Sequence, residues 1–69
     1  MTIEMQFSEL ELAIMQALAD GKGDKQLVDA IPGHTINTLR SHKSYLIGRV
    51  AALNSAHLVA FGFRNNLIK

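Results

Sequence analysis

Three short breaks divide this chain of 69 residues into four segments, and they limit the folds that it can adopt. The breaks are Gly21-Lys22-Gly23, Pro32-Gly33 and Asn54-Ser55. Glycine is common just past a helix C-terminus, proline cannot continue a helix, and serine can cap the start of a new one. Within the segments, apolar residues recur at spacings of three and four, which is the period of an amphipathic helix. The pattern predicts an all-α fold of four helices.

The expected domain covers residues 7–69, and residues 1–6 are expected to form an N-terminal arm. The predicted helices run from Ser8 to about Asp20, from about Asp24 to Ile31, over about residues 36–51, and from Ser55 to about Asn66. Ser8 and Glu11 have the spacing of a capping box. Outside the third helix, the residues expected to face the core are Leu10, Ile14, Ala17, Leu18, Leu27, Ala30, Ile31, Ala56, Val59, Ala60, Phe63 and Leu67.

The third segment, Thr35–Val50, has two unlike faces. Leu39, His42, Leu46 and Val50 share one stripe, so His42 is expected to be a packing residue rather than a ligand. The residues off this stripe are short or basic, namely Arg40, Ser41, Lys43 and Ser44. Such a face suits an anionic partner, and DNA is the obvious candidate. Gly48 within this helix predicts either close approach of a neighbour, or a bend or fraying of the helix at that point.

The charges are distributed unevenly, although the net charge is only +1. Residues 1–29 hold two basic residues against all six acids, which gives −4, whereas residues 30–69 hold five basic residues and no acid, which gives +5. This second part has the charge expected of a phosphate-binding surface. A solvated basic face is the alternative explanation.

The composition excludes several other classes. There is no Cys, so neither a disulfide framework nor a zinc–thiolate site is expected. The three His residues lie on separate segments, no catalytic constellation or phosphate loop is visible, and no cofactor or enzymatic activity is expected. The sequence shows neither a signal peptide nor an apolar run long enough for a membrane span, so a cytoplasmic protein is the expectation.

The second and third helices are joined by the short connection from Pro32 to His34, and such a pair is typical of a helix-turn-helix. Taken together, the residues resemble the LuxR-type (GerE-type) helix-turn-helix domain of bacterial transcription regulators. The matching positions are Phe7, Ser8, Glu11, Ile14-Met15, Leu18-Ala19-Asp20-Gly21, Lys25, Leu27, Thr38-Leu39-Arg40-Ser41-His42, Leu46, Arg49, Asn54 to Val59, and Leu67-Ile68. The resemblance covers about residues 7–68.

The resemblance implies that the third helix enters the major groove of double-stranded DNA. Base contacts are then expected from Arg40, Ser41, Lys43 and Ser44, with Arg40 first because a guanidinium can donate two bonds to guanine. Phosphate contacts are expected from Lys25, Thr35, Asn37, Thr38 and Arg49. Leu58 and Phe61 lie off the expected core stripe, so they either form a homodimer contact through the last helix or fill the core of a thin domain.

The predicted function is therefore that of a small, stand-alone DNA-binding transcriptional regulator. The alternative is a helix-turn-helix protein-interaction module that binds and modulates another regulator or RNA polymerase. The modest net charge, a turn one residue longer than the family's, and the extra apolar residues Leu10 and Leu12 favour this alternative.

Overall fold

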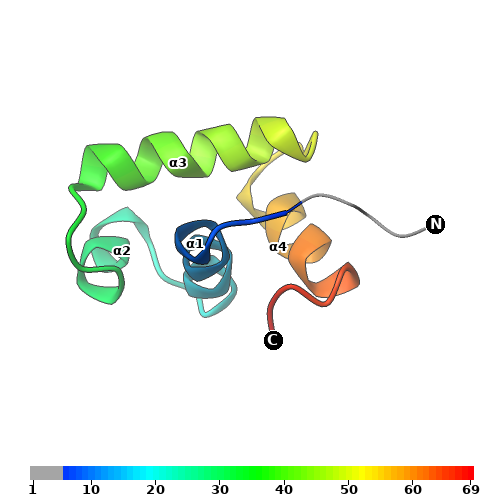
Figure 1. Ribbon diagram of the computed structural model, residues 1–69, viewed down its shortest axis with the longest axis horizontal. Helices are drawn as coiled ribbons and strands as arrows, with labels where there is room; N and C mark the ends of the chain where they lie inside the picture. The colour runs from blue at the N-terminus through cyan, green and yellow to red at the C-terminus, as the bar shows by residue number, and fades with distance from the viewer. Residues whose placement is uncertain (1–5) are drawn as a thin grey trace.

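The structure is a computed structural model that describes residues 6–69, and over this range it contains four α-helices and no strand (Figure 1). α1 spans Glu9–Ala19, α2 spans Asp24–Ala30, α3 spans Ile36–Arg49 and α4 spans Ser55–Arg64. α3 is the longest helix and lies along one side of the molecule, packed against the other three (Figure 1). The predicted all-α, four-helix fold is confirmed. The predicted arm, apart from Gln6, lies outside the described residues.

α1, α3 and α4 each begin after a residue whose side chain accepts a hydrogen bond from a backbone amide of the first turn. Ser8 and Glu11 form the predicted capping box, in which the Ser8 amide donates to the Glu11 carboxylate at 2.8 Å. Thr35 caps α3 by accepting from the Thr38 amide at 3.1 Å. α4 is capped by Asn54, which accepts from the His57 amide at 2.9 Å, and not by Ser55 as predicted. An Asn side chain caps as well as a Ser side chain does, so the cap lies at Asn54 and the helix starts one residue earlier than a Ser55 cap would give.

Three of the helices end in a left-handed residue with the paired hydrogen bonds of a Schellman motif. Gly21 (φ 85°) ends α1, as predicted from its position. Ala51 (φ 57°) ends α3, where the Ala52 amide donates to the Ile47 carbonyl at 2.9 Å. Asn66 (φ 57°) ends α4 in the same way. α3 is thus continuous through Gly48 and turns sharply only after Arg49.

The core is shared by all four helices and the C-terminal segment. Its fully or nearly fully buried side chains are Ile14, Met15, Ala17, Leu27, Ile31, Leu39, Leu46, Leu58 and Ile68. The predictions for Ile14, Ala17, Leu27, Ile31, Leu39 and Leu46 are confirmed. Ala30, Ala56 and Phe63 are exposed, so their predicted core positions are wrong, and Met15 and Leu58 are buried instead.

Because of Gly62, α4 packs against the core through a face other than the predicted one. Gly62 is buried, and a methyl group built on it would lie 2.9 Å from Ile68 Cδ1 and 3.6 Å from Met15 Sδ. The missing side chain lets α4 approach α1 closely along the line of Leu58 and Gly62. Because α4 is apolar on almost every side, its spacing alone did not indicate this face.

No helix within residues 6–69 is long and apolar enough to span a membrane.

Candidate nucleic-acid interface

The outer face of α3 is a stripe of small, uncharged residues. Asn37, Ser41, Ser44 and Gly48 follow one another at spacings of four, three and four, and all four are exposed. Leu39 and Leu46 hold the opposite side of α3 in the core. No atom outside the helix lies within 4 Å of a methyl group built on Gly48, so the predicted close approach of a neighbour at this glycine is wrong. The stripe is an uncovered surface whose backbone a partner can approach closely.

Arg40 lies at the edge of this stripe nearest α2 and is held there by an ion pair. Its Nε lies 3.2 Å from Oδ2 of Asp24, the first residue of α2, and 59% of the Arg40 side chain remains exposed. The guanidinium borders the outer face and is accessible, and the base contact expected of Arg40 stays a prediction. The ion pair with Asp24 orients the Arg40 side chain in the unbound protein.

Lys43 binds the same carboxylate from the inner side. Its Nζ donates to Asp24 Oδ1 at 2.9 Å, and only 21% of its side chain is exposed. Lys43 also lines a second hollow, with Leu18 and Val59, on the side of α3 turned toward α1 and α4. This ammonium group is turned away from the outer face, so the base contact predicted for Lys43 does not fit its position. The Lys43 hydrogen bond is also the largest cause that lowers the pKa of Asp24 below its ordinary value of 3.8.

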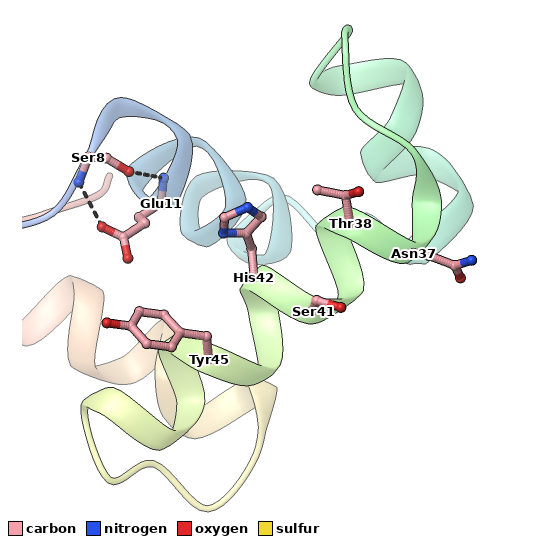
Figure 2. A pocket seen from close by; sticks show the side chains of 7 residues that line it. All are labelled: Ser8, Glu11, Asn37, Thr38, Ser41, His42 and Tyr45. Atoms are coloured by element: carbon pink, nitrogen blue, oxygen red, sulfur yellow. Dashed lines mark hydrogen bonds between the residues drawn. The ribbon is translucent and has the colours of Figure 1, made fainter.

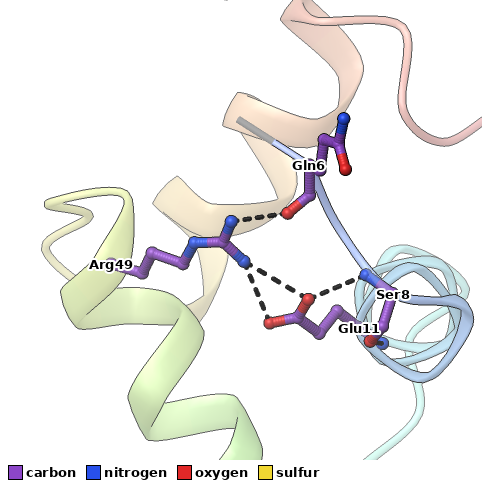
Figure 3. Close-up of polar contacts among 4 residues, drawn as sticks. All are labelled: Gln6, Ser8, Glu11 and Arg49. Atoms are coloured by element: carbon purple, nitrogen blue, oxygen red, sulfur yellow. Dashed lines mark hydrogen bonds and ion pairs between the residues drawn. The ribbon is translucent and has the colours of Figure 1, made fainter. Parts of the chain in front are cut away.

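Arg49, the last residue of α3, is bound inside the fold (Figure 3). Its Nη1 donates to both Glu11 carboxylate oxygens at 3.3 and 3.2 Å, and its Nη2 donates to the Gln6 carbonyl. The guanidinium also stacks 4.6 Å from the ring centre of Phe7. Arg49 thus fastens the end of α3 to the start of α1, and the phosphate contact predicted for it does not fit its position.

Because of these ion pairs, the uneven distribution of charge along the sequence does not become a strongly basic surface on α3. All three cations of α3 meet an acid from the first part of the chain: Asp24 faces Arg40 and Lys43, and Glu11 faces Arg49. Three positive charges against two negative charges leave α3 and its partners with +1. The folded chain therefore does not present the strongly basic surface that the charges of residues 30–69 suggested.

The remaining predicted phosphate contacts lie at the start of α2 and α3. Lys25 and Asn37 are exposed, and neither side chain has a hydrogen-bond or ion-pair partner in the part of the chain that the structure describes. Thr35 is occupied as the α3 cap, and its hydroxyl lies 2.9 Å from that of Thr38. Lys25, Asn37 and Thr38 remain accessible from outside, whereas Thr35 has a structural role.

A groove runs between the start of α1 and the outer side of α3 (Figure 2). It has a volume of about 710 Å³. His42 and Tyr45 project from α3 toward the beginning of α1, and 61% of Tyr45 is exposed (Figure 2). The residues that line this α1–α3 groove are Ser8, Glu11, Asn37, Thr38, Ser41, His42 and Tyr45. The sequence-based prediction missed Tyr45, although an aromatic residue off the core stripe of α3 was a visible signal.

The two predicted dimer contacts have different positions. Leu58 is completely buried in the core, so its predicted contact with a second subunit is wrong. Phe61 is half-buried, and its ring packs edge-on against Phe7, with the centroids 6.1 Å apart. The alternative explanation, a residue that fills the core of a thin domain, therefore holds for Leu58, whereas Phe61 packs against Phe7 outside the buried core. The large apolar residue that α4 exposes is Phe63, at 47%.

His57, near the start of α4, has a structural role. His57 Nδ1 accepts a hydrogen bond from the Leu53 amide at 3.0 Å and so closes the loop before α4. Within residues 6–69, no group of three His, Asp or Glu side chains is placed to hold a metal ion.

A scan of the chain against protein-family models matched none, and searches among curated proteins and among solved structures found no match. The arrangement of residues in the fold is therefore the basis for a functional proposal.

Proposed function

We propose that this protein is a small DNA-binding transcriptional regulator that places α3 in the major groove. The observation that carries the proposal is the outer stripe of α3, which is long, uncovered and made of small polar residues with Arg40 at its edge. An α-helix fits the major groove, where Asn, Ser and Arg side chains can bond to base edges. The order of the four helices and the resemblance of the sequence support a LuxR-type (GerE-type) helix-turn-helix.

We propose a revised set of contacting residues. Arg40 and the stripe residues Asn37, Ser41 and Ser44 are the proposed base contacts, and Lys25 and Thr38 are the proposed phosphate contacts. With Lys43 and Arg49 paired internally, few free cations remain near this face. We therefore expect a shallow dependence on salt, with a slope of about −1 in log K against log salt concentration per protein chain, because Lys25 is the one cation among these phosphate contacts.

Selection from a pool of random duplexes, followed by anisotropy titration of the enriched duplex, tests this proposal. We expect Arg40→Ala to weaken binding to the enriched duplex at least about tenfold, because the loss of one bidentate base contact has that effect. Arg64→Ala is the matched control, since Arg64 is exposed on α4, away from α3. If the wild-type protein enriches no sequence and binds no duplex at low salt, the proposal is wrong.

A homodimer through the last helix remains part of the proposal, with Phe63 in place of Leu58 and Phe61. A symmetric dimer would place two copies of α3 on one face of the DNA. Sedimentation of the wild type and of Phe63→Glu distinguishes the cases, because a buried charge at the contact dissociates a dimer. An association state that is the same in both proteins would count against this surface.

The second candidate function is a protein-interaction module that binds another regulator or RNA polymerase. The α1–α3 groove favours it, because its walls carry an exposed Tyr45 and because the nearby cations are already neutralised. Exposed tyrosines are frequent anchors in protein interfaces. Titration of purified RNA polymerase in the absence of DNA tests it: Tyr45→Ala should weaken binding, whereas Arg40→Ala should not.

A further inference from the structure

One carboxylate joins the two helices of the proposed helix-turn-helix. Asp24 begins α2; one of its carboxylate oxygens forms an ion pair with Arg40 Nε at 3.2 Å, and the other accepts a hydrogen bond from Lys43 Nζ at 2.9 Å. Asp24 and Arg40 are both partly exposed, so water and salt screen this pair and its contribution to stability is small. Its position beside the outer face of α3 suggests another role.

The ion pair with Asp24 involves one of the three guanidinium nitrogens of Arg40. The ion pair is formed by Nε, and the two terminal nitrogens, Nη1 and Nη2, take no part in it. Within residues 6–69 neither of them has a hydrogen-bond partner. Two terminal N–H groups are the donors that bind O6 and N7 of guanine together. Arg40 is therefore held by one edge while the edge that recognises guanine stays free.

The charge of Asp24 has a second effect. A carboxylate beside two cations lowers the positive potential that would attract any phosphate, whatever the base sequence. The acceptor edge of guanine carries no net charge, so it is penalised less by the same carboxylate. Asp24 also keeps Lys43 away from the outer face, where a flexible ammonium group would bind phosphates without regard to sequence.

From these contacts we propose that Asp24 is a positioning residue that determines specificity: it presents Arg40 to guanine and suppresses binding to other sequences. This inference rests on the proposed DNA-binding function. It assigns to α2 a role in base selection, although Asp24 itself touches no base.

The probes are the duplex that the wild type enriches and the same duplex with every guanine replaced by 7-deazaguanine. The replacement removes the N7 acceptor and keeps base pairing. We expect the wild type to bind the unmodified duplex about tenfold more tightly. In Asp24→Asn this ratio should fall close to one, mainly because the modified duplex binds more tightly, and the salt slope should steepen by about one unit as Lys43 becomes free.

Asp29→Asn is the matched control, because it removes the same charge from the same helix, and Asp29 is exposed and forms no ion pair with the described part of α3. Its ratio should remain that of the wild type. Arg40→Lys, which keeps the charge but lacks the paired nitrogens, should lose the preference as Asp24→Asn does. Circular dichroism of each variant checks that all of them are folded.

The outcomes separate the inference from the proposed function. If the wild type binds and prefers the unmodified duplex, and Asp24→Asn keeps that preference, the positioning role is wrong while DNA binding stands. A preference that Asp29→Asn also loses would reduce the effect to net charge and overturn the positioning role. If the wild type binds no duplex at low salt, the proposed function and this inference are both wrong.

Discussion

At the scale of single residues, Arg49 shows how a basic residue near the end of a proposed recognition helix can serve the fold. Its guanidinium is held by Glu11, by the Gln6 carbonyl and by the Phe7 ring, and only 27% of the side chain is exposed. The sequence places Arg49 on a polar segment, and only the folded arrangement shows that the start of α1 covers it.

Replacement of Arg49 should therefore destabilise the protein. We expect Arg49→Ala to lower the free energy of unfolding by about 1–3 kcal/mol, because the partly buried Glu11 carboxylate loses its partner. Arg64→Ala, in the last turn of α4 and exposed, should change it by less than about 0.5 kcal/mol. Urea unfolding of both variants measures the difference, and equal effects would contradict the structural role of Arg49.

Glu11 gives the same cluster a dependence on pH. Burial alone would raise the pKa of Glu11, but the Ser8 amide bond and the Arg49 charge outweigh it, and the pKa lies below the ordinary value of 4.5. A lowered pKa in the folded state stabilises the protein above pH 4.5, and this contribution is lost as the pH falls through the folded pKa.

Glu11→Gln isolates this charge, because Gln at this position can still complete the capping box. The difference in unfolding free energy between wild type and Glu11→Gln should be constant from pH 7 down to about pH 5 and should shrink at lower pH. Denaturant unfolding across this range measures it. A difference that stays constant down to pH 2.5 would show that the charge of Glu11 does not contribute.

At the scale of the elements, the end of α3 has a glycine at a helical position that favours alanine and an alanine at a left-handed position that favours glycine. Gly48 is helical, exposed and has open space where a side chain would lie, whereas Ala51 has a left-handed backbone with φ 57°. Glycine weakens a helix interior, and alanine is strained in the left-handed region.

Exchange of these two residue types should stabilise the protein. We expect Gly48→Ala and Ala51→Gly each to raise the free energy of unfolding by about 1 kcal/mol. Thermal and urea unfolding without DNA measure this effect separately from any change at the outer face. A loss of stability in Ala51→Gly would contradict the Schellman ending of α3.

The helix boundaries could be predicted from the sequence alone, whereas the face that α4 turns to the core could not. Helix breaks and caps are local features, so Gly21, Pro32-Gly33 and Ser8 predicted most boundaries correctly. The facing of α4 depends on which neighbour it approaches, and that depends on Gly62 against Met15 and Ile68. Such a contact between distant parts of the chain has no signature in a helix that is apolar on almost every side.

At the scale of the whole molecule, folding brings acids of the first part of the chain against cations of the second part. The acids of residues 1–29 and the cations of residues 30–69 look like two oppositely charged parts of the chain, but α1 and α2 bring Asp24 and Glu11 against α3. Hydrophobic spacing could predict the outer stripe of α3, because it is the complement of the buried stripe. The pairing of Arg40, Lys43 and Arg49 depends on the packing of the helices, which charge counting along the chain does not include.

We propose that the outer stripe of α3, bordered by Arg40, is the surface that binds DNA. Amide chemical-shift mapping of the isotopically labelled protein during titration with its enriched duplex tests this proposal residue by residue. We predict the largest changes at Asn37, Arg40, Ser41, Ser44 and Gly48, with the exposed side of α4 little affected. Changes confined to other surfaces, or no changes at low salt, would contradict the proposal.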